Sequence, residues 1–296
     1  MALEINYNCA NSLRAFLDQQ GLGMRKKFGQ NFLINQKVRQ SLIDALDAKA
    51  GREVWEIGPG LGAMTAMLLE KSLQVNAFEI DAGFIRILKE LFLHDKNFNL
   101  IEGDVMKTWI KQKNEISIQP EYLLGNLPYN IAAALLADFI ENGFIFSRMV
   151  VTVQKETALR MAAPAGSPDY SSFSVLCSSV YTIKPLMLIK KEAFYPQPNV
   201  DSMGVLLQAR FAAENDQNPD MDSCQGKYPP CFYKLVRALF ASRRKTIKNN
   251  LTAFLSNREL CAAVLQENGI NENERAENLE LEAFLSLAKS IDNMRK

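Results

Sequence analysis

The chain has 296 residues, of which 48% are hydrophobic and 23% are charged, and its formal net charge is +1. This composition is that of a folded globular protein and excludes a disordered chain, while the near-neutral charge argues against a protein that simply coats nucleic acid. No apolar run approaches the roughly 18 residues of a membrane span, and the first residues lack the pattern of a secretory signal.

Catalysis by cysteine or histidine is not expected. The five cysteines are scattered without a Cys-x-x-Cys pair, as in a cytoplasmic protein with reduced thiols. The single histidine, His94, lies in a polar stretch that is typical of a solvated loop. Pro230-Cys231 is similar to the dipeptide of cytosine methyltransferases, but it lies in a proline-rich stretch and such short motifs are common. We therefore expect no bound metal and no cysteine nucleophile.

The amino-terminal part of the chain is predicted to be an extension followed by a basic segment. Residues 1–20 form the extension, with a short helix over residues 12–17. Between residues 19 and 43 the chain has basic residues and no acidic one, so this segment is suited to face a polyanion. Asn35 is predicted to cap the helix that follows. The basic residues nearest the extension are Arg25, Lys26 and Lys27.

A glycine-rich turn is predicted between a buried strand over residues 53–57 and an apolar helix. This order forms the first unit of a nucleotide-binding α/β domain, in which Gly58 and Gly60 let the backbone approach a ligand closely. The spacing Gly-x-Gly-x-Gly differs from that of dinucleotide folds, and Pro59 lacks the backbone donor that a pyrophosphate needs. The turn therefore favours a ligand without phosphates.

Further strands are predicted over residues 75–81 and 99–104, and polar residues follow at their carboxyl ends. Glu79 lies 21 residues after Gly58, the distance at which a strand-end carboxylate binds the ribose hydroxyls of an adenosine ligand. The alternatives are an ordinary surface acid, or Asp81 acting as a helix cap. Asp104 is suited to accept a hydrogen bond from an adenine amino group. Because ligand sites lie at the carboxyl ends of parallel strands, we expect these carboxylates to lie together.

The strand over residues 122–126 stops at Asn126-Leu127-Pro128-Tyr129. This run supplies a side-chain amide, a backbone carbonyl and an aromatic face at one strand end. Such groups can hold a flat, weakly nucleophilic amino group, such as the exocyclic nitrogen of adenine, and draw it toward tetrahedral geometry. The alternative is an ordinary β-turn, which the same residues favour.

The next part of the chain is predicted to contain a strand over residues 149–153, a helix over 155–161, and strands around 175–181 and 203–208. A proline-rich segment between the last two contains Phe194. We expect Phe194 to be a second stacking face for the target base. The alternative is a proline-ordered crossover loop with Phe194 in the core.

The carboxyl-terminal part is predicted to be a polar linker over residues 212–230 and a small all-helical domain over residues 231–296. Residues 231–258 include no acid, so this segment is a second candidate to face a polyanion, although charge runs are often merely solvated helix faces. The residues expected to contact the polyanion in it are Arg243, Arg244, Lys245 and Lys248.

Taken together, these segments resemble the KsgA (RsmA) family of small-subunit ribosomal RNA adenine dimethyltransferases, from about residue 25 to residue 285. So many motifs in the right order are highly specific. The matching stretches are residues 27–33 (Lys-Phe-Gly-Gln-Asn-Phe-Leu), 56–62 (Glu-Ile-Gly-Pro-Gly-Leu-Gly), 125–130 (Gly-Asn-Leu-Pro-Tyr-Asn), Phe194-x-Pro-x-Pro, 200–202 (Val-Asp-Ser), 243–246 (Arg-Arg-Lys-Thr), 269–270 (Gly-Ile) and 275–279 (Arg-Ala-Glu-Asn-Leu).

The resemblance implies an α/β fold, with a Rossmann-like sheet of S-adenosylmethionine-dependent methyltransferases over residues 21–211. It implies dimethylation of the N6 amino groups of two adjacent adenosines near the 3′ end of 16S rRNA in a pre-30S particle, coupled to ribosome maturation. A cytoplasmic monomer is expected. By position, the implied cofactor contacts are Asn31, Leu33, Gly58, Gly60, Glu79, Asp104 and Asn126, and the implied target-base contacts are Asn126, Pro128, Tyr129 and Phe194.

Two rival functions remain open. A methyltransferase that acts on large-subunit rRNA and confers macrolide-type resistance is the nearest, but such relatives generally have Asn-Ile-Pro-Tyr where this chain has Leu127. A catalytically silent ribosome assembly factor is the other, but such proteins are expected to lose site residues. The chain also departs from the family at Ser171-Ser172 and at Ala132, and these departures leave the detailed shape of the target pocket open.

Overall fold

The computed structural model describes residues 3–23, 30–210 and 228–294. Contacts between Cα atoms divide the chain into two compact units. The domain boundaries expected from the sequence stay a prediction, because two stretches of the expected methyltransferase domain cluster with the second unit. The first unit comprises Met1–Leu135, Phe146–Ala158 and Lys184–Ala209, and the second comprises Leu136–Ile145, Leu159–Ile183 and Arg210–Lys296.

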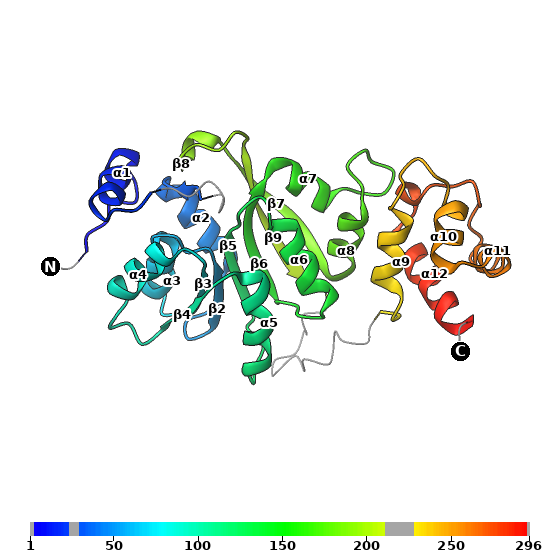
Figure 1. Ribbon diagram of the computed structural model, residues 1–296, viewed down its shortest axis with the longest axis horizontal. Coiled ribbons are helices and arrows are strands. Elements are labelled where there is room, and N and C mark those ends of the chain that lie inside the picture. Colours follow the sequence, from blue (N-terminus) through cyan, green and yellow to red (C-terminus); the bar gives the residue numbers. More distant parts are fainter. Residues whose placement is uncertain (1–2, 24–29, 211–227, 295–296) are drawn as a thin grey trace. The chain divides into compact units, whose positions relative to one another are not determined.

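A seven-stranded sheet with the order β4-β3-β2-β5-β6-β9-β7 is the centre of the fold (Figure 1). The five strands from β4 to β6 are parallel, and β9 runs antiparallel to β6. A separate antiparallel pair joins β1 to β8. The strands are β1 (Phe32–Leu33), β2 (Glu53–Ile57), β3 (Gln74–Glu79), β4 (Phe98–Glu102), β5 (Tyr122–Asn126), β6 (Arg148–Gln154), β7 (Tyr181–Ile189), β8 (Phe194–Tyr195) and β9 (Ser202–Ala209).

Helices connect the parallel strands, as a strand followed by a parallel neighbour requires. The remaining helices lie in the amino-terminal extension, just before β2, between β6 and β7, and in the carboxyl-terminal region. The helices are α1 (Ala10–Gln19), α2 (Gln36–Leu46), α3 (Ala63–Glu70), α4 (Ala82–Leu91), α5 (Val105–Glu115), α6 (Ala132–Glu141), α7 (Lys155–Ala162), α8 (Ser172–Val180), α9 (Phe232–Leu239), α10 (Ile247–Leu255), α11 (Arg258–Glu267) and α12 (Leu281–Met294), with short 3₁₀ turns η2 (Lys191–Ala193) and η4 (Ala276–Asn278).

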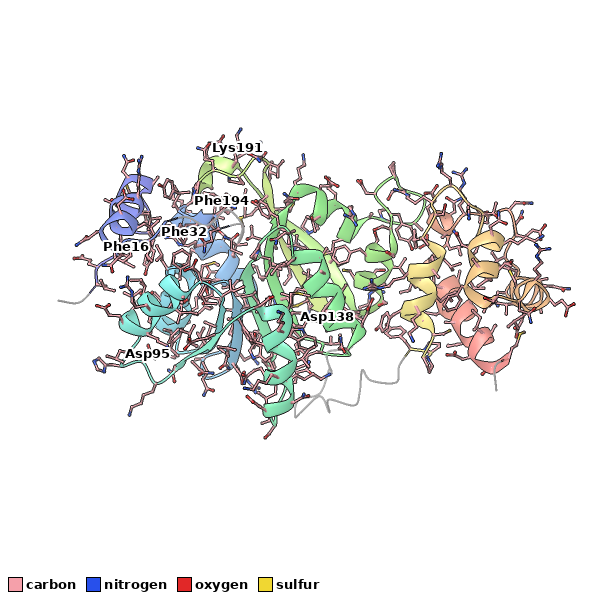
Figure 2. The ribbon with its side chains drawn as sticks, in the orientation of Figure 1. Phe16, Phe32, Asp95, Asp138, Lys191 and Phe194 are labelled. Carbon is pink, nitrogen blue, oxygen red and sulfur yellow. The ribbon has the colours of Figure 1, made fainter. Side chains whose placement is uncertain are left out.

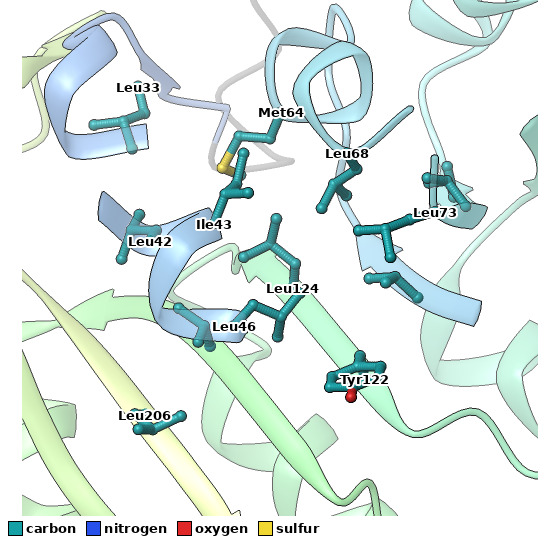
Figure 3. Close-up of a cluster of buried hydrophobic side chains, with 14 of the residues drawn as sticks. Leu33, Leu42, Ile43, Leu46, Met64, Leu68, Leu73, Tyr122, Leu124 and Leu206 are labelled. Atoms are coloured by element: carbon teal, nitrogen blue, oxygen red, sulfur yellow. The ribbon is translucent and has the colours of Figure 1, made fainter. Parts of the chain in front are cut away.

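The core of the first unit lies on both faces of the sheet. On one face, apolar residues of α2 and α3, among them Leu46 and Leu68, pack with strand residues such as Leu124 (Figure 3). On the other face, Trp55 is fully buried with its ring centroid 4.7 Å from that of Phe78. Burial of both faces explains why β5 and β6, inside the sheet, are almost continuously apolar in sequence, whereas the edge strand β4 is not.

Several predicted local features are confirmed. Asn35 begins α2, and its side chain accepts a hydrogen bond from the Val38 amide at 3.2 Å. β5 has the predicted bounds, and β2, β3, β4 and β6 agree with the predicted strands to within two residues at each end. His94 is exposed in a turn. Together with the helical carboxyl-terminal region, the parallel sheet confirms the predicted α/β fold class.

One predicted strand is wrong. The segment around residues 175–181 forms helix α8, and the strand β7 begins only at Tyr181. The segment is mostly apolar and contains Val175, Val180 and Tyr181, residue types that favour a strand in isolation. The Ser171 hydroxyl and Ser174 form a reciprocal capping box that starts a helix, and nearly every residue of that helix is buried. A helix buried all round has no apolar stripe, so the helical period is invisible in the sequence.

In the second unit, α9, α10, α11 and α12 pack against one another around a small core. The predicted apolar residues Leu235, Leu239, Ile247 and Leu251 are fully buried in it. The Asn250 side chain donates hydrogen bonds to the carbonyls of Leu239 and Ser242, at 2.7 and 3.1 Å. The amide thereby satisfies carbonyls at and just beyond the end of α9, where the last turn of a helix leaves carbonyls without intrahelical partners.

Candidate active site

A cavity of about 230 Å³ lies at the carboxyl ends of the parallel strands in the first unit. It collects side chains that follow β2, β3, β4 and β5, as expected for a ligand site in a parallel sheet. Tyr129 and Phe194 do not line it. The predicted site residues that line it are Asn31, Leu33, Gly58, Gly60, Glu79, Asp104, Asn126 and Pro128.

The glycine turn brings backbone to the cavity wall. Gly58 and Gly60 have φ values of +71° and +60°, which glycine adopts without strain. A Cβ atom at Gly60 would lie 3.0 Å from the Phe32 ring, so a side chain there would push against the amino-terminal segment. The turn thus leaves the wall open for a ligand to approach the main chain.

Glu79 ends β3 and is 5% exposed. Its Oε2 atom accepts a hydrogen bond from the Gly60 amide at 3.1 Å, and Oε1 accepts from the amides of Ile80 and Asp81, both at 2.9 Å. Burial raises the pKa of this carboxyl to about 7, and the three amides oppose that rise. Since each carboxylate oxygen can accept two hydrogen bonds, Oε2 has one position left for a ligand hydroxyl.

Two aspartates begin the helices beside Glu79. Asp104 accepts a hydrogen bond from the Met106 amide at 3.0 Å and caps α5. Asp81 caps α4 through the Gly83 amide, and its other oxygen accepts from the Gln30 side chain at 3.0 Å. The suggested cap at Asp81 is therefore present, and Glu79 has a separate place in the cavity wall.

Asn126 is oriented by a contact with the amino-terminal segment. Its Nδ2 atom donates a hydrogen bond to the Asn31 carbonyl at 2.8 Å. A carbonyl can only accept, so this bond assigns the nitrogen and the oxygen of the Asn126 amide. The Oδ1 atom is therefore the acceptor that Asn126 can offer to a ligand in the cavity.

The other predicted target-base residues have partners within the protein. The Pro128 carbonyl accepts from the amides of Ile131 and Ala132, both at 3.1 Å, which engages both of its lone pairs at the start of α6. The Tyr129 hydroxyl lies 2.6 Å from the Ser202 Oγ atom. Contacts of Pro128 and Tyr129 with a base stay a prediction. The Pro128 carbonyl would have to release one of its amide bonds, whereas stacking on the Tyr129 ring leaves the hydroxyl bond in place.

Phe194 is 1% exposed and belongs to the core cluster beneath α2. In the β1–β8 pair it lies opposite Leu33, and Figure 2 marks its place beside the strand that carries Phe32. This is the arrangement of the alternative interpretation, a crossover with Phe194 in the core. A stacking role for Phe194 stays a prediction, and it requires the β8 segment to expose the ring.

The basic residues differ in their surroundings. Arg25, Lys26 and Lys27 lie outside the described residues. Arg243 pairs with Glu277 at 3.1 Å, and Lys248 pairs with Glu272 at 2.6 Å. Arg244 and Lys245 are exposed and form no ion pair with any residue that the structure describes.

Three cavity residues have roles that the sequence did not reveal. Gln30 lies in the stretch over residues 27–33 that matches the family, directly before the predicted contact Asn31, so that stretch was a signal for it. Tyr7 and Arg39 come from the extension and from α2, and no motif marks them. In the described part of the chain, no group of three or more His, Cys, Asp or Glu side chains is placed to hold a metal ion. Nor is any helix there long and apolar enough to cross a membrane.

A buried carboxyl behind the cavity makes stability depend on pH. Glu56 is fully buried, Thr65 donates to its Oε2 atom at 2.7 Å, and its Oε1 atom has no hydrogen-bond partner. Burial raises the pKa of Glu56 to about 7. Between roughly pH 4.5 and 7 the folded state keeps a proton that the unfolded state has released, so the folded state loses stability as pH rises through this window.

We therefore expect Glu56→Gln to be more stable than wild type at pH 8, by about 1–3 kcal/mol, with the difference vanishing near pH 4. The gain is limited because the new amide group replaces an oxygen that has no partner. Urea unfolding of both proteins across this pH range measures the effect. Glu90→Gln, at an exposed position on α4, is the control. Parallel pH profiles of wild type and Glu56→Gln would contradict the expectation.

Comparison with known proteins identifies the family. The family model for ribosomal RNA adenine dimethylase matches residues 21–293. Ribosomal RNA small subunit methyltransferase A of Treponema denticola is 45% identical over 98% of this chain and 97% of its own length. The protein of the same name from Streptococcus pneumoniae is 33% identical over 94% of this chain and 95% of its own.

Solved structures agree with this assignment at the level of the fold. A dimethyladenosine transferase from Plasmodium falciparum matches with a TM-score of 0.68 and 24% identity, over 88% of this chain and 96% of that one. The 23S rRNA methyltransferase ErmE matches with a TM-score of 0.59 and 19% identity, over 88% of this chain and 99% of that one. Because the family model covers nearly the whole chain and the relatives align over at least 95% of their own length, the chain belongs to the ribosomal RNA adenine dimethylase family.

Proposed function

We propose that this protein uses S-adenosylmethionine to dimethylate the N6 amino groups of two adjacent adenosines near the 3′ end of 16S rRNA. The observation that carries the proposal is one cavity in which Glu79 and Asp104 lie together with Asn126. The first two suit an adenosine cofactor, and the third suits the amino group of a target base. The names of the full-length relatives support the small subunit as the target.

The residues of the cavity fit the cofactor chemically. Glu79 has an acceptor position for a ribose hydroxyl, and Asp104 has an oxygen for the adenine amino group. Gly58 and Gly60 let the methionine part lie against the main chain near Asn31 and Leu33. When bound, S-adenosylmethionine supplies a methyl group on a positively charged sulfur, and the carboxylates of the wall favour a cation.

The target base would be held by Asn126. Its Oδ1 atom accepts a hydrogen bond from the N–H of the exocyclic nitrogen and draws that nitrogen out of the plane of the ring, which exposes its lone pair. The Pro128 carbonyl, Tyr129 and Phe194 are the proposed further contacts of the base. The role of these groups is alignment. They bring the amino nitrogen close to the methyl group in the geometry for transfer, and they need no acid–base chemistry to do so.

The proposed transfer is direct, without a covalent enzyme intermediate. None of the cysteines that the structure describes lines the cavity, and Cys177, Cys231 and Cys261 are buried elsewhere. The amino nitrogen becomes acidic only once it is methylated, so it can lose its proton to water. The cavity therefore needs no nucleophile and no strong base.

RNA phosphates are the proposed partners of the basic residues on the second unit. Arg244 and Lys245 are exposed and have no acidic partner among the residues that the structure describes, whereas Arg243 and Lys248 pair with acids. We expect the double variant Arg244→Ala/Lys245→Ala to weaken RNA binding. The slope of the logarithm of the binding constant against the logarithm of the salt concentration should become shallower by about 1–2, because fewer counterions are released on binding when phosphate contacts are lost. Filter binding from low to moderate salt measures this slope.

The matched control is Arg243→Ala/Lys248→Ala, which removes the same charge from the same segment. We expect a smaller change in slope for this control, because Glu277 and Glu272 already neutralise these two side chains. A wild-type slope for the Arg244/Lys245 variant would exclude both residues as phosphate contacts. Arg25, Lys26 and Lys27 are proposed as a second set of RNA contacts.

Mapping the modified nucleotides tests the proposed function. Labelled S-adenosylmethionine is supplied with immature 30S particles and, separately, with 50S precursors, and the modified adenosines are located by primer extension. Label on two adjacent adenosines near the 3′ end of 16S rRNA supports the proposal, in which the protein acts as a cytoplasmic monomer on a pre-30S particle. Label in the 50S precursor would establish the large-subunit alternative, and no label in either would favour a silent assembly factor.

A further inference from the structure

The amino-terminal extension packs against the cavity although it lies outside the family pattern, which begins at residue 21. Leu13 and Leu17 of α1 are buried in a cluster with Phe84 and Ile87 of α4. Figure 2 marks Phe16 of α1 and Phe32 of β1, which pack against the same cluster. The extension is therefore a fixed part of the first unit.

One polar contact joins the extension to the glycine turn. The Tyr7 hydroxyl donates a hydrogen bond to the Leu61 carbonyl at 2.9 Å, and Leu61 lies between Gly60 and Gly62. Both glycines have positive φ values, so the turn has little stiffness of its own. Burial raises the pKa of Tyr7 to about 12, so the hydroxyl keeps its proton and remains a donor at neutral pH.

A second contact joins the extension to β1. Arg39 of α2 is 3% exposed, and its guanidinium donates to the Asn8 side-chain oxygen at 2.6 Å and to the Leu33 carbonyl at 2.5 Å. Both acceptors are neutral, and Arg39 forms no ion pair within the described part of the chain. A buried guanidinium depends strongly on each of its acceptors, because losing one leaves a charged donor group desolvated. Asn8 therefore fixes the side chain that holds β1 in place.

The two contacts meet at the same ligand site. Tyr7 and Leu13 line the cavity themselves. The glycine turn and Leu33, which the two contacts help to hold, line it as well. Asn126 is attached to the same segment, through its bond to the Asn31 carbonyl. The extension thus determines the position of two walls of the cavity, the glycine turn and the segment before α2.

We propose that residues 3–20 are a positioning element of the cofactor site, with Tyr7 and Asn8 as its positioning residues. They hold the glycine turn and β1 in the conformation that binds the cofactor, which removes an ordering cost that binding would otherwise carry. This inference rests on the proposed function, because it takes the ligand of the cavity to be S-adenosylmethionine.

Calorimetric titration of the full chain with S-adenosylmethionine tests the inference. We expect Tyr7→Phe to raise the dissociation constant about five-fold, the change that corresponds to one hydrogen bond, and Asn8→Ala to raise it at least as much. The matched control is Tyr122→Phe, which removes a phenolic hydroxyl at the opposite end of a strand from the cavity. In steady-state assays the KM for the cofactor should rise, while kcat and the KM for RNA stay near wild type.

The possible results separate the inference from the proposed function. Weaker cofactor binding by both variants, with RNA affinity unchanged and Tyr122→Phe like wild type, supports the inference. Equal cofactor affinity in wild type, Tyr7→Phe and Asn8→Ala overturns it, as does a parallel loss of RNA affinity, which would indicate general destabilisation. If wild type itself does not bind S-adenosylmethionine, the proposed function fails and the inference fails with it.

Discussion

Asn126→Ala should lower the turnover number for methyl transfer by about a hundred-fold or more, the scale observed when one preorganised polar group is removed. The Asn126 Nδ2 atom is engaged by the Asn31 carbonyl, so Oδ1 is held in place before the base arrives. Alanine removes this acceptor and also the bond to Asn31. Single-turnover measurements with saturating cofactor and RNA isolate the chemical step.

RNA affinity should barely change in this variant, because the proposed phosphate contacts lie elsewhere in the chain. Asn99→Ala is the matched control, since Asn99 is an exposed residue of β4 whose side chain bonds to Asn76. We expect Asn99→Ala to keep wild-type turnover. A turnover number for Asn126→Ala within a few-fold of wild type would contradict the assigned role.

Glu79→Ala should raise the dissociation constant for S-adenosylmethionine ten-fold or more. A hydrogen bond to a charged group contributes about 1.5–3 kcal/mol, and its loss leaves a buried ligand hydroxyl unsatisfied. The substitution also releases the Gly60, Ile80 and Asp81 amides that the carboxylate holds. The effect on the glycine turn and the effect on the ligand therefore act in the same direction, and calorimetric titration measures their sum.

The neighbouring strand offers a control for Glu79. Glu102 lies opposite Glu79 in the β3–β4 register and ends β4, but it forms an exposed ion pair with Lys89 at 2.6 Å and does not line the cavity. Glu102→Ala removes the same group from the same edge of the sheet. We expect its cofactor affinity to equal that of wild type. If both variants bind the cofactor as tightly as wild type, Glu79 is not a ribose ligand.

The structure shows where the two departures from the family pattern lie. Ser171 begins α8 through its capping box with Ser174, and the Ser174 hydroxyl also donates to the Arg160 carbonyl at 2.5 Å. Ala132 begins α6 and is 1% exposed, so a larger residue there would have to displace its neighbours. Both departures from the family pattern therefore lie at helix starts.

The sequence by itself determined the sheet and the edge at which the cavity lies. Strands β2, β3, β5 and β6 are buried along most of their length, so they appear as short runs rich in apolar residues, and the glycine turn follows the first of them directly. These signals are local, since they depend on residues a few positions apart. Because the carboxyl ends of parallel strands share one edge, Glu79, Asp104 and Asn126 could be placed together without coordinates.

Only the tertiary structure decided which other residues reach that edge and which do not. Tyr7 and Arg39 line the cavity through contacts across more than twenty residues of chain, and no local pattern encodes such contacts. Phe194 lies in the core because β8 pairs with β1. The ion pairs of Arg243 and Lys248 likewise depend on acids that follow much later in the chain. Local sequence shows a segment's preference for helix or strand. The burial of its side chains and the pairing of its strands and charges depend on which distant segments it contacts.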